Sequence, residues 1–151
     1  MRRRGARPRP GAAFALSLWS VGLAAADARA GGPEQDYVLH CQGCHRPDGG
    51  ATPGSVPALA GQVARFLHVP GGRDFLARVP GVAQASLGDG DLARLLNWMV
   101  SRFDAAHVPP DFAPYEAVEV GALRRQPLVD VSEARRRLVA AMERPAPPPP
   151  P

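Results

Sequence analysis

Two cysteines and a histidine lie close together near residue 40. The stretch YVLHCQGCHRPDGG, residues 37–50, contains both cysteines of the 151-residue chain, Cys41 and Cys44, and His45 follows directly. Two thiols and an imidazole in this order fit three kinds of chemistry: a structural zinc ion, a thiol–disulfide redox pair, or covalent attachment of a haem. The surrounding sequence has to distinguish among them.

The spacing of the three residues favours the haem. Residues three and four apart share one face of a helical turn, so Cys41, Cys44 and His45 can all point to the same side. Two thiols on that side can reach the two vinyl groups along one edge of a porphyrin, and the imidazole can bind the iron. C-x-x-C-H is the attachment pattern of c-type haem.

The alternatives lack the residues or the context that they need. A structural zinc site requires four ligands, so His45 and a second histidine would have to join the cysteines, without the paired spacing of zinc fingers. The other histidines are His40, His68 and His107. A thioredoxin-like pair needs a βαβ context, and the sequence contains no strand-like alternation. We therefore predict haem attachment, and a chance pair of cysteines is the remaining alternative.

Residues 1–30 have the pattern of an export signal. MRRRGARPRPG is basic, AAFALSLWSVGLAAA is apolar, and ADARA ends in the small-x-small sequence Ala28-Arg29-Ala30. Signal peptidases cleave after such a sequence, so we predict cleavage after Ala30 and a periplasmic location. A membrane anchor is the alternative, but the apolar run is shorter than the roughly 20 residues of a spanning helix.

Removal of this leader changes the charge of the protein. The leader contains six of the 18 arginines and one of the 14 acidic residues, so the remaining chain has 12 basic and 13 acidic residues. The high calculated pI therefore belongs largely to the leader. No basic stripe with interleaved aromatic residues remains, so we expect no nucleic-acid partner.

The remainder of the chain is predicted to be helical. Pro33 and the acidic residues after it favour a helix over residues 33–44, and an extended loop rich in Pro and Gly follows over 45–61. Helices are expected over 73–79, 88–103, 115–125 and 132–142, with capping by residues 86–89 before the helix over 88–103 and a capping box of Asp130 and Glu133 before the last. The proline-rich tail, 145–151, is expected to be disordered or to form polyproline II.

The stretch YVLHCQGCHRPDGGATPGSVPALAG resembles the beginning of a class I c-type cytochrome of the bacterial kind. The resemblance rests on Tyr37 four residues before the first cysteine, on C-x-x-C-H, on a glycine-rich loop, and on P-x-L-x-G at Pro57, Leu59 and Gly61. The later stretch VPGVAQASLGDGDLARLLNWMV resembles that family's last core helix and the preceding loop, with Trp98 where an aromatic residue packs on the first helix. Together these features cover about residues 33–103.

The resemblance implies an all-α, cytochrome c-like fold closed around one covalently bound haem c. Cys41 and Cys44 would attach the haem, and His45 would be an axial iron ligand whose second ring nitrogen is held by a backbone carbonyl near Pro57. The expected organisation is a signal peptide (1–30), a cytochrome c domain (31–104), a C-terminal helical extension (105–144) and a proline-rich tail (145–151).

The second axial ligand is where the sequence departs from that family. Its members usually have a methionine followed by proline before the last core helix, whereas this chain has Val79-Pro80. The remaining candidates are Met99, His68, His107 and Met142, and an open or water-bound position is the further alternative. The distinction matters because a second protein ligand favours electron transfer, whereas an open position permits the binding of small molecules.

The function implied by the resemblance is one-electron transfer between periplasmic redox partners such as a dehydrogenase, an oxidase or another cytochrome. The sequence contains no constellation of a catalytic acid, base or nucleophile, so we expect an electron carrier rather than an enzyme, with weak peroxidase activity left open. The alternative is a haem protein with an open distal site that acts as a small-ligand binder, a sensor or a weak peroxidase.

Overall fold

The computed structural model describes residues 31–54 and 56–144, and the predicted signal peptide and proline-rich tail lie outside them. The described part of the chain is built from helices and loops, with one isolated bridge between Thr52 and Val56. The expected all-α fold is confirmed within these residues. No helix within the described ranges is long and apolar enough to cross a membrane.

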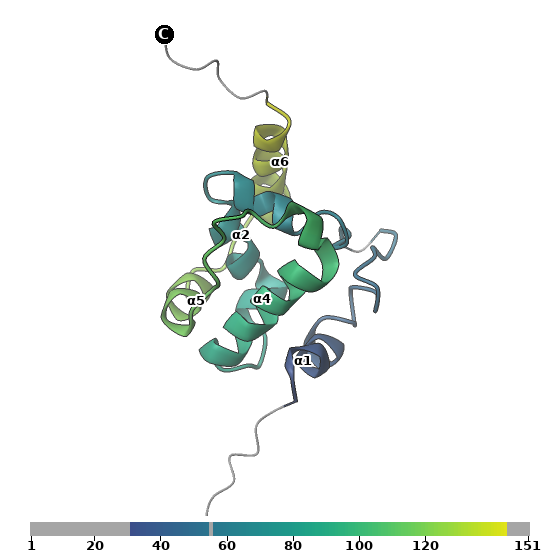
Figure 1. Cartoon of the computed structure of the whole chain (residues 1–151), viewed down its shortest axis with the longest axis vertical. Helices are drawn as coiled ribbons and strands as arrows, with labels where there is room; N and C mark the ends of the chain where they lie inside the picture. The colour runs from purple at the N-terminus through teal and green to yellow at the C-terminus, as the bar shows by residue number, and fades with distance from the viewer. Residues whose placement is uncertain (1–30, 55, 145–151) are drawn as a thin grey trace, which may run out of the picture.

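Six α-helices and two short 3₁₀ helices make up the described structure. In chain order they are α1 (Pro33–His40), η1 (Ala64–His68), α2 (Gly72–Arg78), α3 (Pro80–Ala83), α4 (Asp89–Asp104), η2 (Ala105–His107), α5 (Ala117–Arg124) and α6 (Val131–Met142). The longest helix, α4, runs through the middle of the molecule, with α1 on one side of it and α5 on the other (Figure 1).

Aromatic packing joins α1 to α4. Tyr37 of α1 lies 5.6 Å from Trp98 and 4.9 Å from Phe103 between ring centroids, and both partners belong to α4. Tyr37 is almost fully buried, as are Leu92, Leu95 and Val100 on the apolar face of α4. The expected packing of Trp98 on the first helix is therefore confirmed, and it fixes the end of α1 that leads into the cysteine pair.

The loop after the cysteine pair is tied to the same two helices. The Tyr37 hydroxyl donates to the carbonyl of Arg46 at 2.7 Å, and the Gly61 amide donates to the carbonyl of Phe103 at 3.0 Å. Gly49 has a positive φ of 74°, and a Cβ atom there would lie 2.5 Å from the Phe103 ring. Only glycine allows both the backbone conformation and this close approach.

Two arginines fix the segment after residue 104 to the preceding helices. Arg73 of α2 binds the Glu119 carboxylate of α5 through two hydrogen bonds, of 2.5 and 2.7 Å, and lies over the Tyr115 ring at 4.1 Å. Arg124 of α5 donates to backbone carbonyls of the loop that precedes α4, including that of Leu87 at 2.7 Å. Residues 105–144 thus pack on the helices before them, whereas the domain boundary at residue 104 stays a prediction.

The predicted helices agree with the structure better than the predicted caps. Asp130 accepts a hydrogen bond from the Glu133 amide at 2.8 Å, as expected for the start of α6. The expected side-chain cap of α4 is wrong, because its N-cap is Gly88, which has no side chain. The sequence analysis also missed η1, η2 and α3, which are too short for a helical periodicity to be visible.

The Arg73–Glu119 pair predicts how stability depends on pH. Its hydrogen bonds hold the pKa of Glu119 below the usual value, so the folded state binds fewer protons than the unfolded chain. The stabilisation is complete above the unfolded pKa of about 4.3 and is lost as the pH falls through the lower, folded value. Glu119→Gln should reduce the free energy of unfolding by about 1 kcal/mol at neutral pH. In urea unfolding, the difference in the free energy of unfolding between wild type and Glu119→Gln should shrink below about pH 4. A difference that stays constant with pH would show that the Arg73–Glu119 pair does not stabilise the fold in this way.

Candidate cofactor site

A largely apolar cavity of about 330 Å³ opens between the cysteine loop, α2, α4 and α6. Its volume lies within the range of about 300–1,000 Å³ that is usual for cofactor sites. Cys41, Cys44 and His45 all line it, so the structure brings the three predicted site residues together. The apolar lining includes Leu59, Val63, Phe66, Phe75, Leu76, Leu96 and Val100.

The cysteines and His45 are positioned by a turn that continues α1. The Cys41 amide donates to the Tyr37 carbonyl at 2.9 Å, and the Cys41 carbonyl accepts from the amides of Cys44 (3.1 Å) and His45 (2.9 Å). The chain therefore keeps a helical turn beyond the last residue of α1. This turn places positions 41, 44 and 45 on one side, as their spacing predicts.

The two thiols are free and differ in their surroundings. Cys41 is half-buried and packs against the core, whereas Cys44 is exposed. Burial, with smaller contributions from Cys44 and Asp36, raises the pKa of the Cys41 thiol to about 11. The thiol of Cys41 is therefore neutral at physiological pH, which suits its place on an apolar wall.

His45 presents an imidazole that has a nitrogen without a partner. Burial lowers the pKa of His45, so the ring is neutral at pH 7 and keeps a lone pair for a metal. Its Nδ1 atom is buried and makes no hydrogen bond within the described residues. The expected hydrogen bond to a carbonyl near Pro57 is therefore not formed in this structure. Buried polar atoms nearly always have a partner, so this unpaired nitrogen is an exception that leaves the imidazole with unused binding capacity.

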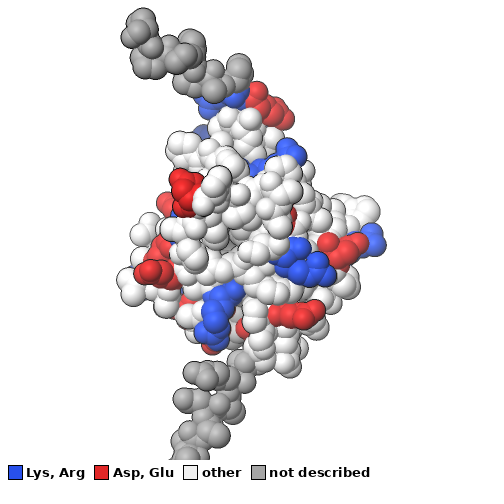
Figure 2. Space-filling view, in the orientation of Figure 1, with Lys and Arg blue, Asp and Glu red and all other residues white. Residues whose placement is uncertain are grey.

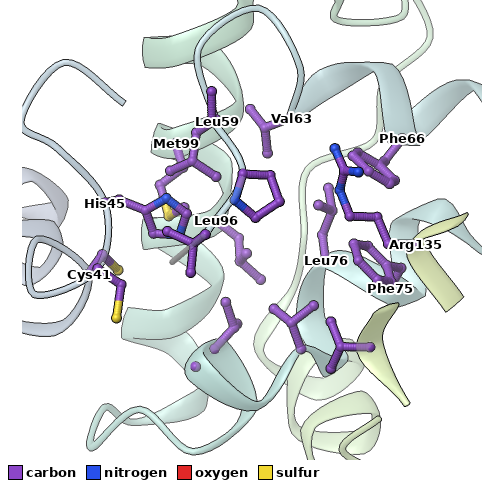
Figure 3. Close-up of a pocket in the computed structure, with 18 of the residues that line it drawn as sticks. Cys41, His45, Leu59, Val63, Phe66, Phe75, Leu76, Leu96, Met99 and Arg135 are labelled. Atoms are coloured by element: carbon purple, nitrogen blue, oxygen red, sulfur yellow. The ribbon is translucent and has the colours of Figure 1, made fainter. Parts of the chain in front are cut away.

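The wall across the cavity from His45 is built from η1, α2 and α6. Figure 3 shows Phe66, Phe75, Leu76 and Arg135 on one side of the cavity, and Cys41 and His45 on the other. Phe66 and Phe75 stack with their ring centroids 5.0 Å apart. Arg135 of α6 makes no hydrogen bond or ion pair with any described residue, although its neighbours Arg136 and Arg137 both pair with Glu133.

The candidates for a second iron ligand lie in two different pockets. Met99 lines the cavity, as do Val79 and Pro80, which replace the expected methionine–proline pair. His68, His107 and Met142 line a second pocket, formed by η1, η2 and the end of α6. The two pockets share no residue, so these three side chains do not reach the cysteine site.

The sequence analysis missed the contribution of α6 to the cavity. Val131 and Arg135 both line it, and they are four residues apart, so they share a face of the helix. That periodicity could have placed Arg135 on the apolar side of α6. Nothing in the sequence, however, indicates that this side of the last helix packs over the cavity.

The residues around the cavity fit a haem and do not fit zinc. The apolar walls suit a porphyrin, the two thiols and the neutral His45 lie at one wall, and the unpaired Arg135 guanidinium suits a carboxylate such as a haem propionate. Among residues 31–54 and 56–144, no group of three or more His, Cys, Asp or Glu side chains could hold a metal ion. The zinc alternative therefore has no site in this part of the chain.

Comparison with known proteins gives relatives of one kind. The chain is 34% identical over 131 residues to a cytochrome c-552 of Thermus thermophilus, in a match that covers 75% of this chain and 84% of the relative. A second Thermus thermophilus cytochrome c-552 is 34% identical over 106 residues, which is 58% of this chain and 81% of the relative. No protein-family profile matches the chain.

Proposed function

Because the chain belongs to the class I c-type cytochromes, we propose that it is an exported monohaem protein that passes single electrons between periplasmic redox partners. The observation that carries the proposal is the position of Cys41, Cys44 and His45 together on the wall of an apolar cavity. Periplasmic export rests on the leader pattern of residues 1–30.

Four side chains of the cavity would hold the cofactor. Cys41 and Cys44 would form thioether bonds to its vinyl groups, and His45 would bind the iron through its neutral ring. Arg135, on the opposite wall, would pair with a carboxylate of the cofactor. A haem held in this way supplies the exchange of one electron at its iron.

The remaining residues of the cavity control access and polarity. The buried side chains of Phe66, Phe75 and Leu96 exclude water from the walls, and a low-dielectric surrounding is one of the factors that set a haem's reduction potential. Cys44 is exposed, so the edge of the site next to it reaches the surface. Electron exchange with a partner is therefore expected at this edge.

The surface favours a redox partner that is held by short-range contact rather than attracted by charge from a distance. Positive and negative side chains are interspersed on the face drawn in Figure 2, and the chain after residue 30 is almost neutral. Val38 and Leu39, on α1 close to the cysteines, are 49% and 67% exposed. A redox partner such as a dehydrogenase, an oxidase or another cytochrome would then dock on apolar surface beside Cys44, with little steering by charge.

A redox titration of the purified holoprotein tests the proposal. The absorption spectrum should change reversibly between two states, and its dependence on potential should fit a single one-electron step, because one C-x-x-C-H site holds one haem. Gly43→Ala is the matched control, since a Cβ atom at this position meets no atom within 4 Å and both cysteines are retained. A coloured protein that is not reversibly reduced would contradict an electron-carrier function.

A further inference from the structure

The number of side chains that could bind iron opposite His45 is small. Axial ligands of c-type haem proteins are imidazoles and thioethers. Apart from His45 and the leader's Met1, the chain contains His40, His68, His107, Met99 and Met142. The question is whether any of these lies on the wall that faces His45.

His68, His107 and Met142 are held away from the cavity. The Nε2 atom of His68 lies 2.7 Å from the carbonyl oxygen of His107. The Nδ1 atom of His107 lies 2.5 Å from the buried carboxylate of Asp104, and its Nε2 atom lies 3.1 Å from Arg65. These contacts occupy one ring nitrogen of His68 and both ring nitrogens of His107, and all three side chains line the second pocket.

Met99 and His40 line the cavity, but from the side of His45. Figure 3 shows Met99 on the same side as His45 and Cys41. Met99 belongs to the core-facing surface of α4 and is almost fully buried. His40 is the last residue of α1 and directly precedes Cys41. A ligand opposite His45 would have to come from the other wall, so neither residue is placed to provide it.

Among residues 31–54 and 56–144, the opposite wall offers no atom that binds iron. Phe66, Phe75 and Leu76 are hydrocarbon side chains, and an arginine such as Arg135 keeps its proton and cannot coordinate a metal. Val79 follows Phe75 by one helical turn, and its amide donates to the Phe75 carbonyl at 3.1 Å. Its side chain therefore shares the face of Phe75 and continues the apolar surface.

We infer that the iron face opposite His45 is left open by this chain and accepts small uncharged ligands, such as carbon monoxide or nitric oxide. The inference rests on the proposed haem site. An apolar wall disfavours a charged ligand, because an ion loses its hydration there without a matching partner. Arg135, the one cation among the described residues of this wall, would be neutralised by the carboxylate of the cofactor. The wall then favours ligands that are small and uncharged.

Spectroscopy of the ferric and ferrous holoprotein tests the inference. Ferric wild type should give a high-spin electron paramagnetic resonance signal, and the ferrous protein should bind carbon monoxide rapidly. Met99→Leu, which conserves core volume, and His68→Gln, at an exposed position, should leave both results unchanged. A low-spin wild type that does not bind carbon monoxide would overturn the inference, and the variant that became high-spin would identify the ligand. A colourless protein would instead count against the proposed haem site.

A thioether placed on the opposite wall gives a second test. Val79→Met should turn the ferric protein low-spin and weaken carbon monoxide binding at least tenfold. Val118→Met is the matched control, because residue 118 is 85% exposed on α5, and it should behave as wild type. Wild-type spin state and carbon monoxide affinity in Val79→Met would show that this wall does not face the iron, which would overturn the inference.

Discussion

Replacing Cys41 and Cys44 together with alanine is expected to abolish covalent haem attachment when the protein is produced in the periplasm with a haem-attachment system. Each single replacement should lower the yield of covalent haem, because one of two thioether bonds is lost. Cys41→Ala should also cost more stability than Cys44→Ala, since Cys41 packs against the core and Cys44 is exposed.

The loss of haem is expected to destabilise the fold as well. The apolar side chains that line the cavity would face water, and burial of apolar surface is worth about 25 cal/mol per Å². In the double variant, the midpoint temperature of thermal unfolding and the covalent haem content should both be lower than in wild type. Gly43→Ala, which preserves C-x-x-C-H, serves as the control, and wild-type haem content in either cysteine variant would refute the assignment.

Gly72→Ala is expected to destabilise the fold strongly, although it adds only one methyl group. A Cβ atom at residue 72 would lie 1.8 Å from the carbonyl oxygen of Phe66, so the backbone of η1 or α2 would have to move. Overpacking of this kind typically costs about 1–3 kcal/mol. Phe66 and Phe75 come from these two elements and line the cavity, so the displacement should also disturb the cofactor site.

Urea unfolding of the holoprotein measures the effect of Gly72→Ala. Gly90→Ala is the matched control, because a Cβ atom there would lie in ordinary contact, 3.9 Å from its nearest neighbours, in the first turn of α4. Alanine is favoured over glycine in helices, by up to about 1 kcal/mol in their interior, so this control in the first turn should be at least as stable as wild type. A Gly72→Ala protein as stable as wild type would show that η1 and α2 are not as closely packed as described.

Features that depend on local periodicity could be predicted from the sequence. The apolar face of α4, the cap at Asp130, and the common side of Cys41, Cys44 and His45 all follow from the geometry of one helical turn. The resemblance to c-type cytochromes rested on the sequence motifs within about residues 33–103, and the relatives confirm it.

Contacts between distant residues could not be predicted from local patterns, and the one that was expected, the packing of Trp98 on the first helix, came from the resemblance. The Arg73–Glu119 pair joins residues 46 positions apart, and the contact between His68 and His107 joins residues 39 apart. The sequence analysis therefore could not place His68 in the second pocket, nor Arg135 on the wall opposite His45. Both positions depend on how the segment after residue 104 packs on the earlier helices.

The central claim is that Cys41, Cys44 and His45 form a covalent haem site in an exported chain. An intact mass spectrum of the denatured wild-type protein, purified from the periplasm of a host with the haem-attachment system, tests it most directly. We expect one species, with the mass of residues 31–151 plus one haem. A polypeptide without added mass, from cells that mature another c-type cytochrome normally, would contradict it.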